Sequence, residues 1–157
     1  MSDVEDFLAE MLPRFVGVVD AMHNGDSAPF AELWSRRDPV TLLGAAAGPA
    51  PAGWESITDA QRSVASLFSN GTPLDFELIA ADVNGDLAYT VGYERSSVSV
   101  HGGPVRPAFL RATQIYRREN GDWKLVHRHA DPVPGSPATD ALKNELKSGP
   151  SASPRPQ

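Results

Sequence analysis

Residues 110–131, LRATQIYRRENGDWKLVHRHAD, place two runs rich in strand-forming residues on either side of Asn120-Gly121. An Asn-Gly pair between such runs is the strongest short-range signal for a β-hairpin, because both residues tolerate the positive φ angles of a type I′ turn. A two-residue turn also fixes which residues face each other. It pairs Thr113 with Arg128 and Arg111 with Ala130, so the sequence predicts both arginines on one face of the hairpin.

A second Asn-Gly pair, Asn84-Gly85, predicts another hairpin between residues 74–83 and 87–100. The same pairing rule places Phe76 opposite Tyr93 and puts Tyr89 on that face. Because this face is apolar and aromatic, we expect it to be the concave side of the sheet. A third turn is predicted at residues 101–104, so that four strands form an antiparallel meander.

Three helices are predicted ahead of these strands. Ser2 and Glu5 fit a capping box, and apolar residues then recur every three or four positions as far as Met22, which is the pattern of a long amphipathic helix. Shorter helical patterns cover residues 27–34 and 54–68, with a short strand at 40–43 between them.

Composition divides the chain into a domain and a tail. Residues 1–132 hold the helix and strand patterns and are predicted to form a single domain. Residues 133–157 are rich in proline and serine, which predicts a disordered C-terminal tail with at most one short polar helix near residues 139–147.

Charge and residue usage exclude several classes of function. The 157-residue chain has a formal net charge of −6 and a pI of about 5.1, which argues against a nucleic-acid partner. It has no cysteine, so disulfides and thiolate metal sites are excluded. The N-terminus lacks the basic region of a signal peptide and no apolar run reaches membrane-spanning length, so we expect a cytoplasmic protein without a membrane partner.

Three segments carry a family resemblance. They are LWSRRDPVTLLGA (33–45), GDLAYTVGYER (85–95) and LRATQIYRRENGDWKLVHRHADP (110–132). These segments resemble the SnoaL-like, ketosteroid-isomerase-like proteins of the nuclear transport factor 2-like superfamily. The resemblance implies an α+β cone, in which three helices pack on a strongly curved, mainly antiparallel sheet around a central pocket.

The resemblance also allows the catalytic residues known in this superfamily to be compared with the residues of this chain. Its steroid isomerases place a general-base aspartate on the first strand and an oxyanion-hole tyrosine on the first helix. These positions fall on Leu43 and Val18, which cannot move a proton or donate to an oxyanion, so that mechanism is not expected.

The ending VHRHAD (126–131) is similar to two further members of the superfamily. One is the association domain of calcium/calmodulin-dependent kinase, whose cavity arginines bind small carboxylates. Its arginine positions fall on Val91, Thr113 and Ala130, although Arg111 and Arg128 could supply the charge from shifted positions. The other is the iota-class carbonic anhydrases, in which a histidine stands where this chain has Arg128.

Arg111 and Arg128, if they point into the cone, indicate a ligand with a carboxylate. A guanidinium inside the cone needs a carboxylate, because an unpaired buried charge is costly. The pairing rule leaves Glu94 on the opposite face, so we expect the carboxylate to come from a small anionic organic ligand. The predicted ligand-binding residues are Trp34, Tyr89, Tyr93, Arg111, Thr113 and Arg128.

An enzyme is the alternative, and the sequence leaves the choice open. It would be of the isomerase, cyclase or hydratase type, or similar to the iota-class anhydrases, with protons moved by Asp38, His127 or Tyr93. His127, His129 and Asp131 alternate onto one strand face, a spacing that suits a metal. Hydrogen-bonded structural histidines are the favoured interpretation, so no metal or cofactor is predicted.

A homodimer is the predicted assembly. Apolar residues on a sheet face that the helices cannot reach need another surface to cover them. We expect a second copy of the chain to cover Tyr116, Leu125 and His127 on the face of the sheet away from the helices.

Overall fold

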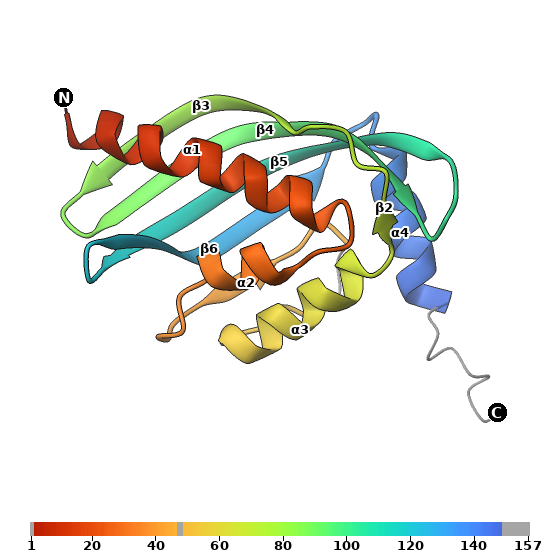
Figure 1. Cartoon of the computed structure of the whole chain (residues 1–157), viewed down its shortest axis with the longest axis horizontal. Coiled ribbons are helices and arrows are strands. Elements are labelled where there is room, and N and C mark those ends of the chain that lie inside the picture. Colours follow the sequence, from red (N-terminus) through yellow and green to blue (C-terminus); the bar gives the residue numbers. More distant parts are fainter. Residues whose placement is uncertain (1, 47–48, 149–157) are drawn as a thin grey trace.

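Helix α1 (Asp3–Met22) lies across the concave face of a curled six-stranded sheet in the computed structural model, which describes residues 2–46 and 49–148 (Figure 1). The other helices are α2 (Ala28–Leu33), α3 (Trp54–Ala65) and α4 (Pro137–Ser148). The strands are β1 (Thr41–Leu43), β2 (Phe68–Ser69), β3 (Asp75–Asn84), β4 (Leu87–Val100), β5 (Val105–Glu119) and β6 (Asp122–Pro132). The α+β class is as predicted, with four described helices in place of three. None of these helices has the length and apolar character needed to cross a membrane.

The sheet has the strand order β1-β6-β5-β4-β2, with β3 also paired to β4. All pairs are antiparallel except the short parallel pair of β1 and β6. The long meander β3–β6 therefore follows the sequence prediction, and β1 closes one edge after the helical segment.

Local sequence signals set the first helix. The Ser2 hydroxyl accepts from the backbone N–H of Glu5 at 3.2 Å, and the Glu5 carboxylate accepts from the backbone N–H of Ser2 at 2.9 Å. The predicted capping box is confirmed. The helix runs through Pro13 and ends before Asn24-Gly25, as its apolar periodicity indicates.

The hairpin between β5 and β6 turns at Asn120-Gly121, whose φ angles are 51° and 82°. The predicted turn is confirmed, but its register holds only as far as the pair Tyr116–Leu125. The next pair is Ile115 with His127, so Val126 is an extra residue that forms a β-bulge.

Because of this bulge, Arg111 and Arg128 lie on opposite faces of the hairpin, not on the same face as predicted. Beyond it, Gln114 pairs with Arg128 and Arg111 pairs with Asp131. Arg128 therefore shares the concave face with Gln114 and Tyr116, and Arg111 lies on the outer face. The prediction that both arginines share a face was wrong, because a single extra residue moves every later side chain to the other face.

The hairpin between β3 and β4 differs from its prediction by one residue. Asn84 pairs with Leu87, so the turn residues are Gly85 and Asp86, and a second irregularity lies between Leu78 and Ala80. Phe76 consequently pairs with Glu94 rather than Tyr93. Placing Tyr89 and Tyr93 on the concave side was therefore wrong, and it is Glu94 that lies there.

The main core fills the space between α1 and the concave face. Phe7 packs edge-on against Tyr116 and Trp123, with ring centroids 5.3 and 5.1 Å apart. Phe15 packs in the same way on Phe76 at 5.7 Å. Tyr116 and Leu125 are fully buried in this core, so the prediction that a second copy covers them was wrong.

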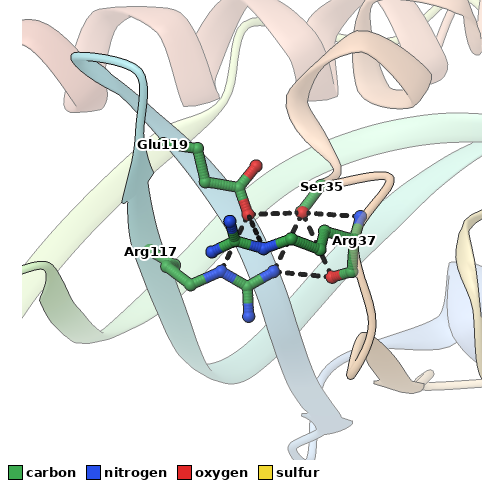
Figure 2. A network of polar contacts seen from close by, with 4 residues as sticks. All are labelled: Ser35, Arg37, Arg117 and Glu119. Carbon is green, nitrogen blue, oxygen red and sulfur yellow. Dashed lines mark hydrogen bonds and ion pairs between the residues drawn. The ribbon is translucent and has the colours of Figure 1, made fainter.

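A polar cluster ties the segment after α2 to the end of β5, as Figure 2 shows. The buried Ser35 hydroxyl donates to the Glu119 carboxylate at 2.7 Å, and Arg117 Nε donates to the same oxygen at 2.7 Å. Arg117 also donates to the backbone carbonyl of Arg37 at 2.6 Å. Burial raises the pKa of Glu119, but the hydrogen bonds from Ser35 and Arg117 outweigh it, so the net shift is downward. The cluster fixes where the chain enters β1.

Helix α4 lies in the segment predicted to be a disordered tail, where one short helix was allowed near residues 139–147. Residues 137–148 form a helix with Pro137 at its first position, and Ala138 and Leu142 are buried on its inner side. These two residues form a second apolar cluster with Val98 and Val100 of β4. Residues 149–157 lie outside the described part of the chain.

Candidate functional site

A cavity of about 340 Å³ lies between the main core and the second apolar cluster. Its lining is mostly apolar and comes from α1, α2, α3, α4, the sheet and residues 44–46, 49 and 51. Apolar lining residues include Val19, Met22, Phe30, Leu42, Val64, Phe68, Val98, Leu110, Leu142 and Leu146. The polar side chains on the wall are His23, Gln61, Ser63, Glu94, Arg128 and Thr139.

The most strongly polar part of the wall is an ion pair between two strands. Arg128 on β6 donates from one terminal nitrogen to Glu94 Oε2 at 2.6 Å and from the other to Oε1 at 2.8 Å. Both residues are buried, with 8% of Arg128 and 3% of Glu94 exposed. This two-point geometry matches a guanidinium to a carboxylate, and it neutralises the charge of both groups inside the cone.

Further hydrogen bonds extend the pair into a buried network. Arg128 also donates to Gln114 Oε1 at 2.9 Å, and the amide nitrogen of Gln114 donates to the Tyr116 hydroxyl at 2.7 Å. Burial raises the pKa of Tyr116, so this hydroxyl stays protonated. Among the described residues, no fully buried side-chain nitrogen or oxygen lacks a hydrogen-bond partner. The network is therefore rigid and fully satisfied.

His23 follows α1 directly and lines the cavity. Its Nδ1 lies 3.4 Å from the Ser96 hydroxyl, and its ring packs edge-on against Phe68 at a centroid distance of 5.2 Å. Burial lowers the pKa of His23, and the attraction of Glu94 for the protonated form only partly offsets this. The imidazole is therefore neutral near pH 7.

Gln61 on α3 is oriented by one of the predicted residues. The indole N–H of Trp34 donates to Gln61 Oε1 at 2.9 Å, which fixes the direction of the side-chain amide. Gln61 lines the cavity and Trp34 stands behind it in the core. Trp34 thus positions a wall residue rather than forming the wall.

The structure brings few of the predicted ligand-binding residues together. Arg128 lines the cavity, but Arg111 and Thr113 are exposed on the outer face. Tyr89 is 41% exposed on that face. Tyr93 packs there against Phe109, with ring centroids 5.5 Å apart.

The three predicted proton-moving residues also lie away from the cavity. Asp38 lines a separate open cleft beside Glu55 and Asp59. His127 lies on the outer face, where its Nδ1 is 2.7 Å from the Thr41 hydroxyl. In the described part of the chain, no three histidine, aspartate or glutamate side chains gather closely enough to hold a metal ion.

The sequence reasoning missed His23, Gln61 and Glu94 as wall residues. The sequence pattern could have indicated that Glu94 points inward. Every second residue of β4 is buried in the row Ala88, Thr90, Gly92 and Glu94. Gly92 makes room in that row for Phe76, whose ring would lie 2.5 Å from an added Cβ. Nothing local in the sequence marks His23 or Gln61, since helix packing alone turns them toward the cavity.

Comparisons with known structures agree with this architecture. A proposed dehydratase of the nuclear transport factor 2-like family from Streptomyces avermitilis is 22% identical with a TM-score of 0.65, over 82% of this chain and 97% of that chain. A proposed aromatic ring hydroxylase from Novosphingobium aromaticivorans is 14% identical with a TM-score of 0.65, over 80% and 86%. A nuclear transport factor 2-like superfamily protein from Salmonella enterica is 16% identical with a TM-score of 0.63, over 82% and 89%. At these identities the likeness shows a shared fold.

Sequence comparison identifies the family. No curated protein matches the chain. The model of the SnoaL-like domain matches residues 14–134, which cover β1–β6, α2, α3 and the C-terminal part of α1. This protein therefore belongs to the SnoaL-like domain family, and it shares its fold with nuclear transport factor 2-like proteins.

Proposed function

We propose that the protein binds a small, mostly apolar and uncharged organic molecule in this cavity. The observation that carries the proposal is the two-point ion pair of Arg128 with Glu94. Because the guanidinium already has its counter-ion, an anionic ligand would gain little from Arg128 and would be repelled by Glu94. The reason for expecting an anionic ligand thus disappears, since Glu94 supplies the carboxylate.

The lining supports the same ligand class. A cavity of about 340 Å³ with mostly apolar walls and a few polar groups is typical of small-molecule sites, which span ~300–1,000 Å³. Burial of apolar ligand surface supplies the binding free energy. The amide of Gln61 and the imidazole of His23 then orient one polar group of the ligand.

Competition between matched ligands tests this proposal. The neutral fluorophore N-phenyl-1-naphthylamine serves as the probe, displaced by either 1-naphthalenemethanol or 1-naphthoate. We expect the alcohol to displace the probe at lower concentration than the carboxylate. Tighter binding of the carboxylate would contradict the neutral-ligand class and restore the anionic one.

A cavity-filling variant shows where the probe binds. Ala60 on α3 lines the cavity, whereas Ser56, one turn earlier, is exposed outside it. We expect Ala60→Phe to weaken probe binding by about tenfold or more, equivalent to ~1.4 kcal/mol. Ser56→Phe should bind as the parent does, and equal loss in both variants would place the probe elsewhere.

A second candidate function is catalysis by proton transfer, and His23 is the observation that favours it. A neutral imidazole in an apolar cavity can accept a proton from a bound carbon acid, and Glu94 then stabilises the imidazolium. This residue takes the role that the sequence analysis gave to Asp38, His127 or Tyr93.

The elimination reaction of 5-nitrobenzisoxazole tests His23 without knowledge of the natural substrate. In this reaction a base removes the ring C–H proton, the N–O bond breaks, and a coloured cyanophenolate forms. We expect the rate to fall with decreasing pH, with a midpoint below 6.5, because burial lowers the pKa of His23. His23→Gln should abolish the reaction and His127→Gln should not, whereas equal rates in all three proteins would exclude His23 as the base.

A further inference from the structure

Helix α4 lies beyond residues 14–134, which the family model matches, yet it forms one wall of the cavity. Ala138, Thr139, Leu142 and Leu146 all line it. This chain therefore completes its ligand site with an element outside the matched domain.

The cavity lies between two separate apolar clusters. The main core joins α1, α2 and the sheet, whereas α4 belongs to the second cluster through Ala138 and Leu142. Cooperative units of this kind open at different free energies, and a small peripheral cluster opens more readily than the main core. Movement of α4 would therefore widen the cavity without unfolding the rest of the domain.

The two ends of α4 are attached differently. At its start, the buried Ser136 hydroxyl accepts from the backbone N–H of Phe109 at 3.0 Å and lies 2.7 Å from the Thr139 hydroxyl. Near its end, Glu145 lies 3.6 Å from Nδ1 of His101 in the β4–β5 turn, and both side chains are substantially exposed. Ala138 and Thr139 near the start are buried, whereas Leu146 and Lys147 near the end are exposed, so the later half of the helix is the more easily displaced end.

The mouth of the cavity lies at that displaceable end. Of its described lining residues, the exposed ones are Gly44, Pro49, Ser63 and Leu146. Leu146 belongs to the last turns of α4. Gly44 and Pro49 follow β1, and Ser63 belongs to α3. Outward movement of the end of α4 would widen the mouth.

We propose that α4 is a lid: its C-terminal half swings away about the anchored Ser136 to admit the ligand and then closes on it through Leu142 and Leu146. This proposal rests on the proposed ligand binding. Ligand bound between the two clusters joins them, so binding holds the lid closed.

A cross-link that ties the end of α4 to the β4–β5 turn tests the lid. The chain has no cysteine, so the double variant His101→Cys/Glu145→Cys can be bridged by a short bis-maleimide without side reactions. We expect the bridged protein to take up N-phenyl-1-naphthylamine at least about tenfold more slowly than the same variant blocked with a monofunctional maleimide. Equal uptake rates would overturn the lid.

Hydrogen exchange supplies a second measurement on the unmodified chain. Saturating probe should slow amide exchange in residues 137–148 more than in β5, because the bound ligand contacts α4. Leu142→Ala should weaken probe binding, whereas Lys147→Ala, at an exposed position on the same helix, should not. Unchanged exchange in α4 would also overturn the lid.

The two proposals fail in distinguishable ways. Absence of probe binding by the parent protein would contradict the proposed function itself. Normal binding with equal uptake in bridged and blocked proteins would leave ligand binding intact and contradict the lid alone.

Discussion

The ion pair of Arg128 and Glu94 shows how a single buried charge constrains its surroundings. The sequence correctly indicated that an arginine inside the cone requires a carboxylate. It assigned that carboxylate to a ligand, because the idealised hairpins placed Glu94 on the other face. Two one-residue register changes place Glu94 on the same face as Arg128, where the two side chains pair, and this pairing supports the proposal of an uncharged ligand.

Breaking this pair should be costly. In Arg128→Met, Glu94 is left buried without its counter-ion, so we expect the free energy of unfolding to fall by about 3–5 kcal/mol in urea denaturation. The double variant Arg128→Met/Glu94→Leu should recover much of this loss, because it removes both charges.

An exposed pair is the control for that measurement. Arg62 and Asp59 are 2.9 Å apart but mostly exposed, so Arg62→Met should cost about 1 kcal/mol or less. Similar losses for Arg128→Met and Arg62→Met would mean that the buried pair contributes no more than a surface contact.

At the scale of elements, the cluster around Ser35 and Glu119 joins the helical segment to the sheet (Figure 2). Its members are separated by about eighty positions in the chain, and the Ser35 backbone N–H also donates to the Leu125 carbonyl at 2.9 Å. The segment between α2 and β1 is thereby held in place, and with it the parallel pairing of β1 with β6.

Ser35→Ala should weaken this junction. It removes the hydroxyl that donates to Glu119 and leaves Arg117 one acceptor short, so we expect a loss of about 1–3 kcal/mol in the free energy of unfolding. Ser66→Ala is the matched control, because its hydroxyl donates to the Ser63 carbonyl at 2.6 Å but is exposed. Ser66→Ala should cost about 0.5 kcal/mol or less, and equal effects would contradict a structural role for the cluster.

At the scale of the whole molecule, the outer face of the sheet presents Leu43 and Tyr89, each 41% exposed, together with His127 and Thr113. We propose that a second copy of the chain covers this face, because apolar side chains on a broad, uncovered sheet favour association. His127 thus remains an interface residue as the sequence predicted, whereas Leu43 and Tyr89 take the place of Tyr116 and Leu125.

Light scattering at micromolar concentration measures this assembly directly. We expect a particle of twice the 16.8 kDa chain mass. Thr113→Lys, at an exposed central position of the outer face, should shift the protein toward monomer. Glu10→Lys on the exposed side of α1 adds the same residue elsewhere and should leave the dimer intact, and a monomeric parent would contradict the proposal.

The sequence by itself determined the elements and their order. The capping box at Ser2, the helical periodicity of α1 and the turn at Asn120-Gly121 depend on residues close together in the chain, and all three are present. Local signals therefore sufficed for the fold class and for the family resemblance.

The tertiary structure alone decided which side chains meet in the cavity. The bulge at Val126 and the irregularity between Leu78 and Ala80 each move side chains to the opposite face, and packing rather than local preference selects them. The sequence allowed a short helix at the position of α4, but only the fold shows that Ala138 and Leu142 pack against Val98 and Val100 of β4. The face on which a side chain lies and the residues that it contacts depend on segments far apart in the chain. They are therefore decided only when the chain is folded.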